Sequence, residues 1–261
     1  MLTESEQNTR VLDQFEKQAE SYAALVSRNS KDPTLPILLE AMQPLPTDRM
    51  LDVGCGSGRF AIEIAPLVAN VIGVDLTPAM LEQAAKLQAQ TQVKNVEWRQ
   101  TDVTQLPFAD GEFNIVSCTS MLHHVVSPAR VIAEMRRVCA VGGRIVAKDV
   151  TPKREKSPAA NAIEILRDPS HVYAMTGAEL RAIGAELGLK EIVVHESQTR
   201  IPLEAVLRTS FPPEGILDHL RRLFRLDAET GVDALGFGAH LENGEVYLVY
   251  PMTLVVWDRG E

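Results

Sequence analysis

Cysteine is scarce in this chain. Among 261 residues there are three, Cys55, Cys118 and Cys139, which lie far apart and form no Cys-x-x-Cys pair. Because zinc sites and disulfide frameworks use closely spaced sets of cysteines, we expect neither, and no metal site is predicted.

Long hydrophobic runs are also missing. No apolar stretch approaches the roughly 18 residues that a membrane-spanning helix needs. Residues 1–6 are acidic and polar, without the basic start and apolar core of a secretion signal. We therefore expect a cytoplasmic protein without a membrane span.

Basic residues are outnumbered by acidic ones. The chain has 26 Lys and Arg against 35 Asp and Glu, a formal net charge of −9 at pH 7. An acidic surface repels the phosphates of nucleic acids, so no nucleic-acid partner is expected. The apolar share of 45% is ordinary for a soluble protein, and the length suffices for a large core.

From residue 50 onward, short apolar strands alternate with longer helices. Thr77-Pro78 and Ser127-Pro128 each combine an N-cap residue with a proline in the first turn, which is typical of a helix start. Such alternation predicts a parallel sheet with helices on both faces. The expected strands are 50–53, 70–74, 96–99, 113–118 and 144–149, and the helices between them are 59–67, 77–90 and 128–139, the last ended by Gly142-Gly143.

The flanking segments have different patterns. Helical spacing predicts helices at 10–27 and 34–42, and we interpret residues 1–45 as an N-terminal helical lid. After Val150, Thr176 and Glu179 form a capping-box helix start. Residues 46–261 are expected to form one domain.

Two antiparallel strands, 191–195 and 246–257, are expected to end this domain, with residues 199–245 as a substrate-side insert between them. The apolar residues of the insert would form either a wall of the substrate pocket or ordinary core. They are Phe211, Leu217, Leu220, Leu223 and Phe224.

A glycine-rich turn follows the first predicted strand. Gly54, Gly56 and Gly58 are spaced Gly-x-Gly-x-Gly, and glycines let the backbone approach a ligand beyond the carboxyl ends of the strands. Arg59 stands where a dinucleotide fingerprint has its third glycine, and no Gly-Lys-Ser/Thr of a P-loop follows.

Carboxylates end the next two strands. Asp75 lies 21 residues after Gly54, where a carboxylate can bind the two hydroxyls of a ribose, as in NAD or S-adenosylmethionine. Asp102 follows the third strand and can accept from an adenine amino group.

With these features the chain resembles the class I S-adenosylmethionine-dependent methyltransferases, especially the branch of the ubiquinone/menaquinone C-methyltransferases. The resemblance covers roughly residues 49–150. It implies a doubly wound, mostly parallel, seven-stranded Rossmann-like α/β sheet with an antiparallel last strand. It rests on LDVGCGSGRF (51–60), VIGVDLTPAMLEQA (71–84), DVTQLPFADGEFNIV (102–116) and ARVIAEMRRVCAVGGRIVAKD (129–149), together with QFEKQAESYA (14–23) before them.

The resemblance also implies cofactor contacts. Asp52, where the family often has Glu, would orient the loop and the methionine ammonium, and Tyr22 would cover the carboxylate end when the lid closes. The whole implied set is Tyr22, Asp52, Gly54, Gly56, Gly58, Asp75, Leu76, Met80, Asp102, Val103 and Thr119.

Three residues are candidates for proton transfer. His123 and His124 follow the fourth strand and Asp149 ends the fifth, so all three point to the rim where a methyl acceptor would lie. The nearby segment 167–171 would either cap the substrate pocket or form a plain turn.

The expected function is methyl transfer from S-adenosylmethionine to a small, partly hydrophobic acceptor by a monomer or homodimer, with S-adenosylhomocysteine as product. Two alternatives stay open. One is a non-methylating S-adenosylmethionine-binding protein or a cyclase on the same fold. The other is an NAD-dependent reductase, which the absence of a Tyr-x-x-x-Lys pair disfavours.

Overall fold

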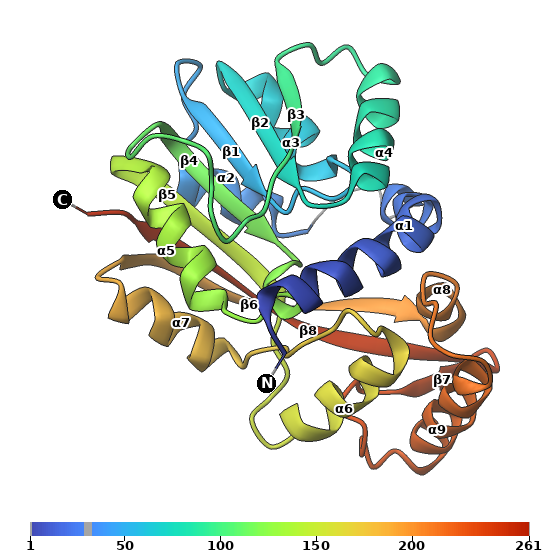
Figure 1. Cartoon of the computed structure of the whole chain (residues 1–261). Coiled ribbons are helices and arrows are strands. Elements are labelled where there is room, and N and C mark those ends of the chain that lie inside the picture. The colour runs from blue at the N-terminus through green and yellow to red at the C-terminus, as the bar shows by residue number, and fades with distance from the viewer. Residues whose placement is uncertain (1, 29–32, 261) are drawn as a thin grey trace.

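A single mixed sheet organises the chain, as Figure 1 shows for the computed structural model, which describes residues 2–28 and 33–260. The strand order is β3-β2-β1-β4-β5-β8-β6, and β7 pairs with β8 beside this path. Strands β1 to β5 are parallel, whereas β8 is antiparallel to β5 and β6. The strands are β1 Arg49–Val53, β2 Asn70–Asp75, β3 Val96–Gln100, β4 Phe113–Thr119, β5 Cys139–Val150, β6 Lys190–Pro202, β7 His240–Glu242 and β8 Glu245–Asp258.

This topology confirms the predicted fold class. The path through the sheet has the seven expected strands, and the last strand, β8, is antiparallel. The sheet gains an eighth strand because His240–Glu242, within the segment interpreted as an insert, pairs with the start of β8.

Helices cover both faces of the sheet (Figure 1). Because successive residues of a strand point to opposite faces, Leu51 packs in the core cluster with α5 and α7, and Met50 packs in the one with α2 and α3. No helix of the described ranges is long and apolar enough to cross a bilayer. The helices are α1 Glu4–Arg28, α2 Leu35–Met42, α3 Arg59–Ile64, η1 Ala65–Leu67, α4 Pro78–Ala89, η2 Leu122–His124, α5 Pro128–Val138, α6 Ser157–Arg167, α7 Gly177–Glu186, α8 Leu203–Leu207 and α9 Ile216–Thr230.

A third core cluster joins α6, α8 and α9 to the beginning of β8. Leu220 and Phe224 of α9 are fully buried in this cluster. Of the two interpretations of the apolar insert residues, ordinary core therefore holds for this pair. Phe237, which is not among the residues selected from the sequence, belongs to the same cluster and also lines a cavity.

The predicted role of Gly142-Gly143 is wrong. Helix α5 ends at Val138, and both glycines lie inside β5. The pairing of β5 with β4 shifts register between Phe113 and Ile115, and a Cβ at Gly143 would lie 2.6 Å from the carbonyl oxygen of Asn114. The two glycines thus lie at an irregularity in the pairing of β4 and β5, where the backbones of the two strands approach closely.

Two helix starts were misjudged from the sequence. Helix α1 begins at Glu4, six residues earlier than expected, because Thr3 and Glu6 form a reciprocal cap: the Thr3 N–H donates to Glu6 (2.9 Å) and the Glu6 N–H donates to the Thr3 hydroxyl (3.2 Å). Helix α6 was not predicted, although Ser157-Pro158 repeats the start pattern of α4 and α5.

Candidate active site

The glycine-rich loop after β1 is tied to the end of β2. The Gly56 N–H donates to one carboxylate oxygen of Asp75 (2.9 Å), and the Thr77 N–H donates to the other (2.9 Å). Burial raises the pKa of Asp75, and these two hydrogen bonds oppose that rise. The carboxylate that was predicted to bind a ribose therefore also holds the loop in shape.

Backbone conformation and neighbouring side chains constrain the three loop glycines in different ways. All have positive φ, +68° at Gly54, +51° at Gly56 and +77° at Gly58, which disfavours other residues. A Cβ at Gly58 would overlap the ring of Trp98, and one at Gly54 would lie 2.5 Å from Met121. At Gly56, apart from the adjoining residues, no atom of the described chain lies within 4 Å of such a Cβ, so this position is open to a ligand.

Asp52 is a buried carboxylate with one free oxygen. Its side chain accepts a hydrogen bond of 2.7 Å from the Ser117 hydroxyl at one oxygen. The second oxygen has no hydrogen-bond partner within the described ranges. Burial raises the pKa of Asp52 to about 7, and a cationic group on a ligand would stabilise its charged form. Asp52 and Gly56 thus fit a cofactor that carries an ammonium group.

Asp102 already has partners. One carboxylate oxygen accepts from the Thr104 N–H (2.8 Å) and hydroxyl (2.7 Å), and the other accepts from the Asn8 amide of α1 (2.8 Å). Burial opposes ionisation, but these hydrogen bonds outweigh it and lower the pKa of Asp102. An adenine amino group would share this carboxylate with Asn8 or replace Asn8.

The other predicted cofactor residues lie at the same edge of the sheet with different exposures. Met80 is 1% exposed and Val103 is 8% exposed, so both act mainly as packing, while Leu76 and Thr119 are half-buried. On α1, burial and then the charges of Asp149 and Asp75 raise the pKa of Tyr22.

His123 and Asp149 form a close pair between the loop after β4 and the end of β5. The His123 Nδ1 lies 2.5 Å from Asp149 Oδ1, and the His123 backbone N–H donates to Oδ2 (3.3 Å). Burial disfavours the charged forms of both side chains. The attraction between the two charges and the hydrogen bond between the side chains outweigh this effect. The pKa of His123 is therefore raised, and that of Asp149 is lowered.

His124 faces a different environment. Its Nδ1 lies 3.2 Å from the Ser170 carbonyl oxygen and 3.1 Å from the Ser170 hydroxyl, and its ring meets Phe15 of α1 edge-on at 4.9 Å. Burial, followed by the charge of His123, lowers the pKa of His124 to about 4. The two neighbouring histidines thus differ, since the pKa of His123 is raised and that of His124 is lowered.

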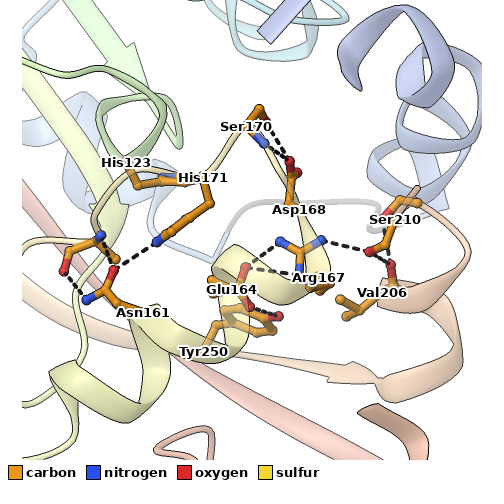
Figure 2. A network of polar contacts seen from close by, with 12 residues as sticks. His123, Asn161, Glu164, Arg167, Asp168, Ser170, His171, Val206, Ser210 and Tyr250 are labelled. Carbon is orange, nitrogen blue, oxygen red and sulfur yellow. Dashed lines mark hydrogen bonds and ion pairs between the residues drawn. The ribbon is translucent and has the colours of Figure 1, made fainter. Parts of the chain in front are cut away.

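A cavity with a volume of about 60 Å³ adjoins His123. Its polar wall contains the buried ion pair of Arg167 and Glu164 (Figure 2). The Arg167 guanidinium also donates to the Ser210 hydroxyl (2.9 Å). The Tyr250 hydroxyl donates to the other oxygen of Glu164 (3.1 Å). The lining residues are His123, Val150, Pro152, Ala160, Glu164, Arg167, His171, Ala174, Gly236, Phe237, Tyr250 and Pro251.

Most of this cavity is not evident from the sequence. Arg167 and His171 are expected only as parts of a turn or cap, and Glu164 and Tyr250 are not among the predicted site residues. The one available signal was Ser157-Pro158, which predicts a helix that would carry Glu164 and Arg167 on one face three residues apart.

The buried histidines predict acid sensitivity. The pKa values of His124 and His171 fall from 6.5 to about 4 and about 3 in the folded state, both mainly through burial. Below pH 6.5 the unfolded chain therefore binds more protons, so stability falls as pH drops. For His124 the loss by pH 4 is about 3 kcal/mol.

We expect His124→Asn to reduce this pH dependence of the free energy of unfolding, measured by urea titration between pH 6.5 and pH 4. The matched control is His219→Asn, since His219 is exposed on α9. Equal slopes for the wild type and His124→Asn would contradict the buried, neutral state of His124.

Comparisons with known proteins agree with this geometry. The family model described as "Methyltransferase domain" matches residues 51–147. The "Uncharacterized methyltransferase YcgJ" of Bacillus subtilis is 31% identical over 172 residues, which are 65% of this chain and 67% of that protein. The "Ubiquinone biosynthesis O-methyltransferase" of Acinetobacter baylyi is 33% identical over 133 residues, so the match spans 50% of each protein.

Solved structures share the fold. The crystal structure of YcgJ has a TM-score of 0.76 at 24% identity, covering 87% of this chain and 98% of that one. The [4+2]-cyclase SpnF has a TM-score of 0.65 at 15% identity, covering 96% of both chains. With a relative more than 30% identical over two thirds of its length, this chain belongs to the class I S-adenosylmethionine-dependent methyltransferase family.

Proposed function

We propose that this protein transfers the methyl group of S-adenosylmethionine to a small, partly hydrophobic acceptor and releases S-adenosylhomocysteine. The observation that carries the proposal is the continuity between two sites. His123 belongs both to the carboxyl edge of the sheet, through Asp149, and to the wall of the cavity. A methyl donor at the glycine loop and an acceptor in the cavity would meet beside this histidine.

Residues of the glycine loop would hold the cofactor. The open face at Gly56 would allow close approach, the free oxygen of Asp52 would bind the ammonium group, and Asp75 would bind the ribose. The cofactor supplies an electrophilic methyl group. The protein's part is to align the acceptor and to exclude water.

His123 would act as the base that removes a proton from the acceptor. Its Nδ1 faces Asp149, which leaves Nε2 as the position that can take a proton when the ring is neutral. Asp149 keeps the ring orientation and stabilises the imidazolium that forms. His124 faces Ser170 and does not line the cavity.

Helix α1 would act as a lid, and its docking contacts are amide groups. The Gln7 side chain donates to the carbonyl oxygens of His124 (2.8 Å) and Ser170 (2.6 Å), and Gln18 donates to Asp168 (3.0 Å). Gln14 is 5% exposed, and its Oε1 has no partner among the residues described. A ligand donor beneath the lid would satisfy this oxygen.

A cyclase or a non-methylating binding protein is the alternative to this activity. The likeness to SpnF concerns the fold, and either alternative would bind the cofactor without consuming it. Release of S-adenosylhomocysteine with a panel of candidate acceptors and radiolabelled methyl donor distinguishes methyl transfer from both.

We expect S-adenosylhomocysteine to bind with micromolar affinity in calorimetry, and NAD not to bind. Asp75→Ala should weaken binding at least tenfold, because the loss of a charged hydrogen-bond acceptor costs about 1.5–3 kcal/mol and also frees the Gly56 loop. Asp102→Asn keeps a carbonyl acceptor and should have a smaller effect. The reverse order, or a preference for NAD, would contradict the assignment of these carboxylates.

The His123–Asp149 pair predicts a shift in the pH profile of methyl transfer. Since the Asp149 charge raises the pKa of His123, Asp149→Asn should move the rising limb of kcat to lower pH, with a reduced plateau. His124→Asn is the control and should leave the midpoint in place. An unchanged midpoint in Asp149→Asn would contradict the role of His123 as base.

The lid predicts a loss of activity when its amide contacts are removed. Gln7→Ala with Gln18→Ala should lower kcat for methyl transfer at least tenfold, because buried polar groups of the loop lose their partners. Lys17→Ala, on the exposed side of α1, is the control. Hydrogen exchange of residues 4–28 should slow when S-adenosylhomocysteine binds the wild type, and unchanged exchange with full activity of the double variant would contradict the lid.

A further inference from the structure

His171, a residue of the cavity wall, has a buried ring nitrogen without a hydrogen-bond partner in the described chain. Its side chain is 5% exposed, and its Nδ1 has no hydrogen-bond partner among the described residues. By contrast, the Arg167–Glu164 pair is satisfied by its own contacts and by Ser210 and Tyr250. Because a buried polar atom without a partner is unfavourable, the free Nδ1 points to a ligand.

The neighbouring Asn161 determines which nitrogen of His171 carries the proton. The Asn161 amide nitrogen donates to the carbonyl oxygens of Ser157 (3.0 Å) and Ala174 (3.1 Å), and its Oδ1 accepts from the Ala174 N–H (2.6 Å). These partners fix the orientation of the amide. The His171 Nε2, 2.8 Å from the same Oδ1, must therefore be the donor (Figure 2).

A neutral His171 with its proton on Nε2 carries a bare lone pair on Nδ1. The ring stays neutral because burial, followed by the charge of His123, lowers the pKa of His171 to about 3. Such a ring is too weak a base to remove a proton near neutral pH. It is suited to accept a hydrogen bond and to keep accepting it throughout a reaction.

We propose that His171 is a specificity residue whose Nδ1 accepts a hydrogen bond from a hydroxyl or N–H group of the methyl acceptor. The proposal rests on the proposed function for the identity of the ligand. The ring centroids of His123 and His171 are 5.6 Å apart, so one small molecule can contact both.

Two variants separate the two nitrogens of His171. His171→Gln places an amide nitrogen near Nε2, which preserves a donor to Asn161 and removes the Nδ1 acceptor. His171→Asn places an amide oxygen near Nδ1 and gives up the contact with Asn161. A purely structural role of His171 would make His171→Asn the more damaging change, whereas ligand recognition makes His171→Gln the more damaging one.

The binding test uses β-naphthol and its methyl ether as probes, titrated into the full chain with S-adenosylhomocysteine present. We expect β-naphthol to bind the wild type and to bind His171→Gln at least tenfold more weakly, with partial recovery in His171→Asn. The methyl ether, which has no donor, should bind all three proteins alike. Absence of β-naphthol binding to the wild type, or equal responses of the two probes to His171→Gln, would overturn the proposal.

Nitrogen-15 spectra of the wild type provide a test that needs no variant to fold. Long-range proton–nitrogen correlations should show His171 neutral, protonated at Nε2 and unprotonated at Nδ1, and the Nδ1 signal should move when β-naphthol is added. A proton on Nδ1 of the free protein would overturn the proposal. If S-adenosylhomocysteine fails to bind, the proposed function falls, while the same probes without it still decide the role of His171.

Discussion

The buried pair of His123 and Asp149 joins the parts of the molecule that carry its chemistry. Its side-chain bond connects the loop after β4 to the end of β5, and the His123 carbonyl oxygen accepts from the N–H groups of Val172 (2.9 Å) and Tyr173 (3.2 Å). The segment that contains His171 is thus held in place by His123 as well. Removing one partner would leave the other charge buried, which costs about 3–5 kcal/mol, so this link is both structural and chemical.

Helix α1, the proposed lid, contacts that segment in turn. Gln7 and Gln18 of α1 contact Ser170 and Asp168, and Asn8 contacts Asp102 on the cofactor side. Amide contacts between a helix and loop carbonyls are weaker than a large apolar interface and are readily exchanged for water. Such contacts, rather than a continuous apolar seam, suit the proposed opening of α1 for a cofactor and an acceptor.

Local patterns in the sequence predicted the glycine turn and the carboxylates at the strand ends, but not the cavity that we propose for the acceptor. The glycine spacing, Asp75 and Asp102 follow directly from strands that end in turns, so their placement needs no long-range information. Glu164 and Tyr250 lie 86 residues apart, and nothing near either residue indicates that they meet. The packing of Trp98 against Gly58 is equally non-local. Whether the predicted residues bind the cofactor stays a prediction.

The register of β8 explains how these distant residues come together. Met252 pairs with Val150, the last residue of β5, and Asp258 pairs with Arg144, so residues 252–258 belong to the central sheet. Residues 245–251 extend beyond the end of β5 and pair with β6 and β7. This overhang carries Tyr250 to the cavity. One strand therefore serves two regions. Residues 252–258 stabilise the central sheet, whereas residues 245–251 pair with β6 and β7, pack into the third core cluster and bring Tyr250 to the cavity that we propose for the acceptor.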